Sequence, residues 1–162
     1  MTQPNKLYDA LIDAFYKALR QRQFEQIEKV IEQLRTRASS QLQYSLWAEY
    51  FSGILAEERD RNWAAAETCY RHVLGSDAHL ILRAHVLLSL GVAYDKQARW
   101  EDSVEACVAS AAAWETLGYP VRRAIVLRQI AISYRSGHLA GEFEPDVLKT
   151  ATDYCHEALE IL

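Results

Sequence analysis

One pattern of apolar and small residues occurs twice in the second half of the chain, and it constrains the fold more than any other feature. The stretch LLSLGVAYDKQARW runs from Leu87 to Trp100, and LRQIAISYRSGHL begins forty residues later, at Leu127. Each has the spacing of one face of an α-helix. The corresponding pairs are Leu87 with Leu127, Leu90 with Ile130, Gly91 with Ala131, and Tyr94 with Tyr134.

A second pattern recurs on the helix that follows each of these faces. An aromatic residue opens the second helix of the first three predicted pairs, at Phe24, Trp63 and Trp100, with intervals of 39 and 37 residues. Periods of this length are typical of stacked helical hairpins that share one continuous core. The small or apolar residues that follow are Ile27, Ile31 and Leu34; Ala66, Tyr70 and Val73; Ser103, Cys107 and Ser110; and, in the last pair, Ala151, Cys155 and Ala158.

Helical periodicity continues through nearly the whole chain, which has only three prolines and six glycines to interrupt it. Gly75, Gly118 and Gly137 are expected to end helices, and Ser76 or Asp77 to begin one. Because short connections make consecutive helices antiparallel, the sequence predicts an all-α protein with one domain over residues 1–162. The predicted helices are 4–20, 24–37, 41–59, 63–74, 78–97, 101–117, 121–136 and 146–162, in four hairpins at about 4–38, 41–75, 77–118 and 120–162.

Composition argues against several classes of partner. The net charge is −4, so we expect no general electrostatic binding of nucleic acid, which needs a basic surface. No apolar run approaches the roughly 18 residues of a membrane span, and the N-terminus lacks the apolar block of a secretory signal. The three cysteines are odd in number and far apart in the sequence. This usage favours a reducing compartment, most simply the cytoplasm.

The sequence offers no convincing catalytic or metal site. No glycine-rich loop is present to hold a phosphate, and no cofactor is expected. The stretch CHEALE begins like the helical zinc motif H-E-x-x-H, but Glu160 stands where the second histidine is needed. Cys69 and His72 could form a nucleophile and base. Because Cys107 and Cys155 recur at nearly the same repeat position as Cys69, we expect all three cysteines to be packing residues.

These residues resemble the tetratricopeptide repeat (TPR), whose first helix carries a large residue, Leu, a small residue and Tyr. Leu87, Leu90, Gly91 and Tyr94 match this pattern well, and the face that begins at Leu127 matches nearly as well. The period of 37–40 residues exceeds the usual 34, and Cys107 and Cys155 replace an aromatic residue. The resemblance implies an α-solenoid of four hairpins in a right-handed superhelix. The longer repeats are also similar to those in sensor arms of multidomain signalling ATPases.

In TPR proteins the first helices of the hairpins line a concave groove, so the resemblance implies a binding surface there. Arg128 and Arg135 are seven residues apart and therefore share one helical face, with Lys96 expected near them. They could hold carboxylates of an acidic partner segment, or simply be solvated or paired with acids. The predicted groove residues are Tyr16, Trp47, Tyr50, Glu57, His85, Leu88, Asp95, Lys96, Arg128 and Arg135, with Asp9, Ile12 and Arg20 also on this face.

Together these features predict a non-enzymatic module that binds a protein or peptide segment in its groove. The alternative is an effector-sensing arm of a larger signalling protein that binds a small molecule. A large apolar pocket with few polar groups would favour the sensor. Leu159, Ile161 and Leu162 also suggest an apolar C-terminal edge. We expect a second copy, or the rest of a longer chain, to cover this edge.

Overall fold

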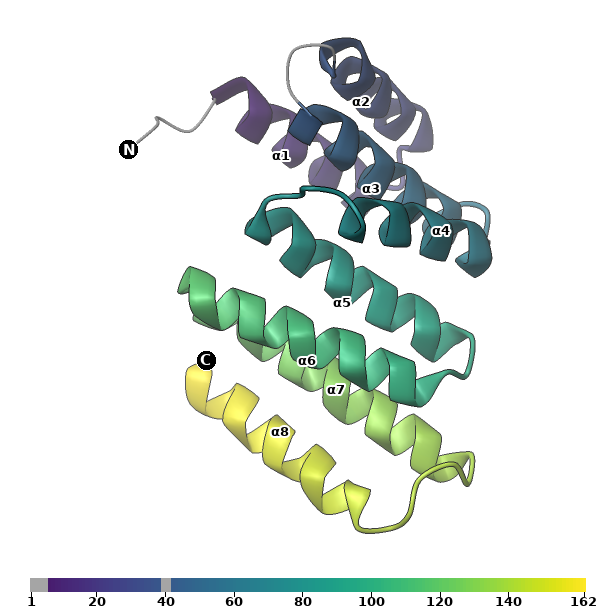
Figure 1. Ribbon diagram of the computed structural model, residues 1–162, viewed down its shortest axis with the longest axis vertical. Helices are drawn as coiled ribbons and strands as arrows, with labels where there is room; N and C mark the ends of the chain where they lie inside the picture. The colour runs from purple at the N-terminus through teal and green to yellow at the C-terminus, as the bar shows by residue number, and fades with distance from the viewer. Residues whose placement is uncertain (1–5, 39–41) are drawn as a thin grey trace. The chain divides into compact units, whose positions relative to one another are not determined.

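The computed structural model describes residues 6–38 and 42–162, with side chains from Ala10 onward (Figure 1). Over these residues the protein is all-α and contains no strand. Two predicted helix starts, those at Pro4 and Gln41, lie outside the described residues. The side chain of Asp9 also lies outside them. The helices are α1 (Lys6–Arg20), α2 (Phe24–Arg37), α3 (Leu42–Glu58), α4 (Trp63–Leu74), α5 (Leu80–Lys96), α6 (Trp100–Leu117), α7 (Pro120–Leu139) and α8 (Val147–Ile161).

Most helix ends follow the local signals in the sequence. The Asn62 side chain accepts a hydrogen bond from the backbone N–H of Ala65 and caps α4. Pro120 occupies the first position of α7, and Gly118 ends α6 in the left-handed conformation with φ of 73°. Gly75 also ends α4, as predicted, although its φ of −76° is right-handed rather than left-handed.

Two other predicted ends are wrong. The residue before α5 is His79, and neither Ser76 nor Asp77 caps this helix. Helix α7 continues through Gly137 to Leu139. Gly137 is a packing residue, since a Cβ there would lie 2.5 Å from the Phe143 ring. The left-handed glycine that follows α7 is Gly141, with φ of 82°.

The helices form two compact units, Met1–Ala78 and His79–Leu162. In the first unit, α1 packs on α2, α2 on α3, and α3 on α4. The rings of Phe15 and Phe51 stack with centroids 3.5 Å apart, so α1 also contacts α3. Helix α3 therefore has neighbours on several sides. The largest fully buried side chains of this unit are those of Phe15, Ile27, Leu34, Trp47, Phe51 and Tyr70.

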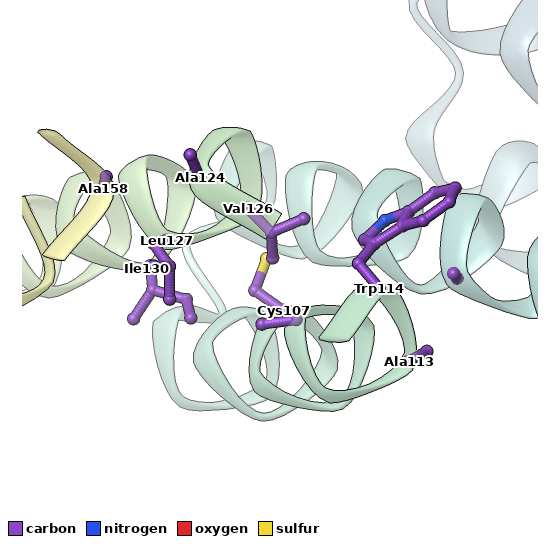
Figure 2. Close-up of a cluster of buried hydrophobic side chains, with 10 residues drawn as sticks. Cys107, Ala113, Trp114, Ala124, Val126, Leu127, Ile130 and Ala158 are labelled. Atoms are coloured by element: carbon purple, nitrogen blue, oxygen red, sulfur yellow. The ribbon is translucent and has the colours of Figure 1, made fainter. Parts of the chain in front are cut away.

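In the second unit, α6 packs between α5 and α7, and α8 packs mainly against α7. Small residues on α6 allow these helices to approach closely. The Ser103 hydroxyl donates a hydrogen bond to the Gly91 carbonyl at 2.7 Å and lies 2.8 Å from the Ser133 hydroxyl. Helices α5, α6 and α7 are thus linked through buried hydroxyl groups. Figure 2 shows the apolar cluster beside this link, which includes Cys107, Trp114, Val126, Leu127 and Ile130.

Gly91 marks the closest contact between α5 and α6, as its place in the repeated pattern predicts. A Cβ atom at this position would overlap the Cys107 Sγ atom and lie 3.1 Å from the Ser103 carbonyl oxygen. The glycine is therefore required by packing rather than by backbone conformation, since it lies inside helix α5. The sulfur atom of Cys107 fills the space that a larger residue at position 91 would need.

We expect Gly91→Ala to lower the free energy of unfolding by about 1–3 kcal/mol, because the added methyl group overpacks this contact. Adding Cys107→Ala should recover part of the loss, since it removes the overlapping sulfur, with a coupling free energy of about 0.5–3 kcal/mol. Chemical denaturation of both single variants and the double variant measures this coupling. Gly75→Ala is the matched control, because a Cβ there meets only ordinary contacts. Purely additive effects at positions 91 and 107 would contradict the assignment.

Candidate interaction surface

The residues predicted to form the groove in the first unit are mostly core residues. Trp47, Tyr50 and Glu57 are only 1%, 2% and 6% exposed. Tyr16 is half-buried and packs edge-on against Phe15 and Phe51. Much of the surface of α3 is covered, because α2 and α4 flank it and Phe15 of α1 stacks on it. The sequence contains a signal of this burial, since LWAEYFSGILA is apolar on every side of the helix.

Glu57 is the unusual member of this core, because it brings a carboxyl group into an apolar environment. The pKa of Glu57 is raised from 4.5 to about 7, mainly because burial disfavours the charged carboxylate. A hydrogen bond from Tyr70 lowers this pKa, and the nearby charge of Glu58 raises it. The Tyr70 ring reaches this region over Gly53, where a Cβ would lie 2.5 Å from the ring. The Glu57 carboxyl therefore changes its charge near neutral pH inside the first unit.

The raised pKa of Glu57 predicts a pH dependence of stability. The unfolded chain loses this proton near pH 4.5, whereas the folded protein keeps it to about pH 7. The stabilisation from the neutral carboxyl is therefore complete below pH 4.5 and is lost as the pH rises through 7. Glu57→Gln cannot ionise, so its stability relative to the parent should rise by on the order of 3 kcal/mol between these limits.

Chemical denaturation across this pH range, followed by circular dichroism, tests the prediction. Glu58→Gln is the matched control, because Glu58 is the exposed neighbour in the same helical turn. Parallel stability profiles for Glu57→Gln and the parent would show that the buried carboxyl does not titrate as proposed.

Three of the residues predicted in the second unit pack inward. The ring of His85 meets that of Trp114 edge-on with centroids 4.9 Å apart. Burial, helped by the charge of Arg122, lowers the His85 pKa to about 4, so the imidazole is neutral at pH 7. Leu88 packs on the apolar cluster, and Asp95 is half-buried. Lys96 is exposed in the last turn of α5.

Helix α7 presents a row of exposed side chains that includes both predicted arginines. Arg128 and Arg135 are exposed, and neither forms an ion pair with another described residue. Arg123, by contrast, points to α8 and pairs with Glu157. Four aliphatic residues lie on the same row, with exposures from 40% for Ile132 to 73% for Leu139. The row, called the α7 row below, is Val121, Ile125, Arg128, Ile132, Arg135 and Leu139.

The α7 row borders a groove between α7 and α8 with a volume of about 550 Å³. Arg128 is the single charged side chain among the described residues that line it. Leu159 and Leu162, on the α8 side, are 70% and 78% exposed. The sequence interpretation identified the arginines but missed the aliphatic residues between them. The groove is lined by Ala124, Ile125, Arg128, Cys155, Ala158, Leu159 and Leu162.

Cys155 is exposed in this groove, which corrects the prediction that it is a packing residue. Cys107 lies on α6, which has a helix on either side, whereas α8 packs mainly against α7. The buried face of α8 follows Ala151 and Ala158, with Tyr154 between them stacking on Tyr134 at 6.3 Å. By its spacing Cys155 belongs on the side of Ala151 and Ala158, but it lies at the edge of this face that opens into the groove and is exposed there.

A thiol reagent should distinguish the three cysteines in the native protein. Burial is the main reason that the pKa of both Cys69 and Cys107 is raised to about 12. The negative charge of Glu49 adds to the increase at Cys69, and that of Asp95 adds to it at Cys107. Both thiols therefore form little thiolate at neutral pH. We expect one prompt reaction, at Cys155, and two slow ones that become prompt in denaturant. Mass spectrometry of the labelled peptides identifies the site. Prompt native labelling of Cys107, or a protected Cys155, would contradict the placement of these residues.

Two further observations concern metal ions and membranes. No three His, Cys, Asp or Glu side chains among the described residues are arranged to hold a metal ion. None of the described helices has both the length and the apolar composition needed to cross a membrane. Neither a protein-family model nor a curated protein matches the sequence. The geometry of the α7 row and its groove is therefore the observation on which a function can be based.

Proposed function

We propose that the protein is a non-enzymatic interaction module of the TPR-like type, which binds an acidic segment of another protein along the α7 row. The hairpin order of the helices and the small residue Gly91 at a close helix contact support the TPR-like solenoid, as does the contact of α5 with α7. The observation that carries the functional proposal is the exposure of four aliphatic side chains around two arginines that form no ion pair with other described residues.

A row of exposed aliphatic side chains is unfavourable in water. Covering it with a partner makes the binding free energy more favourable by about 25 cal/mol for each Å² of apolar surface buried. Arginine adds specificity, because its planar guanidinium can hold a carboxylate through two parallel hydrogen bonds. The positive charge is also concentrated in one segment of the chain. The segment from Val121 to Arg135 contains four arginines and no acidic residue, within a chain of net charge −4. An acidic and partly apolar segment complements this surface best.

Reversing the two charges tests this proposal. Arg128→Glu combined with Arg135→Glu should abolish capture of the natural partner from lysate, because two attractive contacts become repulsive. The helical signal should persist, since exposed substitutions usually change stability by less than about 0.5 kcal/mol. Lys17→Glu combined with Lys29→Glu is the matched control, with the same charge change at exposed positions of the first unit.

The control variant should capture the partner as the parent does, and capture by the parent should weaken as salt rises, because ions screen exposed charges. If the charge-reversed variant captures the partner as well as the parent does, or if capture by the parent does not depend on salt, the two arginines are not part of the binding surface.

A second function, as an effector-sensing arm, is supported by the same groove. An apolar groove of about 550 Å³ with one guanidinium fits a small apolar carboxylate in size and charge. This alternative predicts that the partner-free protein binds such a molecule tightly, and that its free energy of unfolding rises with the logarithm of ligand concentration once that concentration exceeds the dissociation constant. The interaction module requires no such ligand.

A further inference from the structure

The two sides of the α7–α8 groove both present rows of side chains that follow the helix axes. On α7, Ile125 and Arg128 line the groove, and Ile132 and Arg135 continue the row. On the α8 side, the exposed residues Leu148, Thr152, Cys155, Leu159 and Leu162 recur at intervals of four and three. A groove between two packed helices accommodates a third helix, since interhelical distances are about 8–10 Å. The shape of the groove alone does not yet distinguish a helix from an extended peptide.

Backbone hydrogen bonding makes this distinction. The groove is walled by two regular helices, whose N–H and C=O groups are used within those helices. An extended peptide in the groove would place its own N–H and C=O groups against an apolar lining that offers Arg128 as its one charged partner. Each buried backbone group without a hydrogen bond is costly. A helix satisfies these groups internally and presents only side chains to the groove.

The arginines define the register of such a helix. Residues 128 and 135 are seven apart on α7, which places them two turns, or about 10 Å, apart along the axis. On a helix lying alongside α7, acidic residues that are also seven apart would match them, with apolar residues at the intervening positions of the same face.

We infer that the α7–α8 groove binds one amphipathic α-helix of another protein, with acidic residues seven apart that meet Arg128 and Arg135. This inference rests on the proposed interaction function and names the form and charge of its partner. A symmetric contact of two copies through this groove is unfavourable. Neither the segment from Val121 to Leu139 nor the exposed row of α8 contains an acidic residue, so such a contact would bring arginines together without counter-charges.

The test uses Cys155 as a reporter, because its exposed thiol lies inside the groove. The probe is a synthetic helical peptide of about five turns, roughly 18 residues, with leucines along one face and two glutamates seven apart on that face. One control peptide has lysine in place of both glutamates. Another keeps two glutamates but is broken by prolines, with the glutamates three residues apart to match the same distance in extended form.

We expect the acidic helix at about ten times its dissociation constant to slow Cys155 labelling about tenfold, by mass action. The lysine helix and the proline-broken peptide should leave the rate unchanged. In the variant with Arg128→Glu and Arg135→Glu, the preference should reverse, so that the lysine helix protects Cys155 and the acidic helix does not. The variant with Lys17→Glu and Lys29→Glu should behave as the parent, and circular dichroism verifies that each variant is folded.

Several outcomes would overturn the inference. These are equal protection by the glutamate and lysine helices, stronger protection by the proline-broken peptide, and no protection at millimolar peptide. Protection of Cys155 that rises with protein concentration alone, together with a dimer in sedimentation, would assign the groove to a second copy. Protection by vesicles of anionic lipid without any by the acidic helix would assign it to a membrane surface.

The result also separates this inference from the proposed function. If capture from lysate depends on Arg128 and Arg135 but no helix protects Cys155, the helical partner is wrong and the interaction module stands. If neither capture nor protection responds to the two arginines, both proposals fail.

Discussion

The close contact between α5 and α6 at Gly91 determines how the rest of the second unit is arranged. Without a side chain at this position, the backbone of α5 comes within hydrogen-bonding distance of Ser103, whose hydroxyl also meets Ser133 on α7. These buried hydrogen bonds restrict rotation of the helices about their axes, because breaking them would leave buried polar groups unsatisfied. Because Ser133 faces inward, its neighbour Ile132 and the residues in line with it, Arg128 and Arg135, are held on the outer face. The link at Gly91 thereby positions the proposed binding surface.

Much of the fold was predictable from the sequence because its signals are local. Aromatic residues open α2, α4 and α6 at Phe24, Trp63 and Trp100, and Gly118 ends α6 as expected. Gly91 was identified from its place in a repeated face, and the structure confirms the close contact. Gly137 was misread as a helix end, because the ring of Phe143 that requires this glycine comes from outside the helix. Local sequence cannot distinguish a glycine that ends a helix from one that makes space for a distant side chain.

The candidate site was less predictable, because exposure depends on which helices pack together. Trp47, Tyr50 and Glu57 occupy positions that the TPR resemblance assigns to a groove, but α3 is covered on several sides. Cys155 was expected to be buried by its spacing, and the side of α8 on which it lies is open. The aliphatic residues of the α7 row were missed because periodicity reads apolar residues as core. The segment AIVLRQIAIS has more apolar residues than one buried face can hold, and this excess is the signal for an exposed apolar surface.

The two arginines in the α7 row explain how an exposed apolar surface can be specific rather than merely adhesive. Arg128 and Arg135 interrupt the aliphatic row, so that no long uninterrupted apolar strip faces solvent. They also oppose self-association, since pairing two copies through this face would bury like charges without acidic partners. The same charges favour a partner that supplies carboxylates at a matching interval. Attraction of one partner and rejection of another both contribute to selectivity, because specificity is a difference between two binding free energies. A row of aliphatic residues alone would provide affinity without that difference.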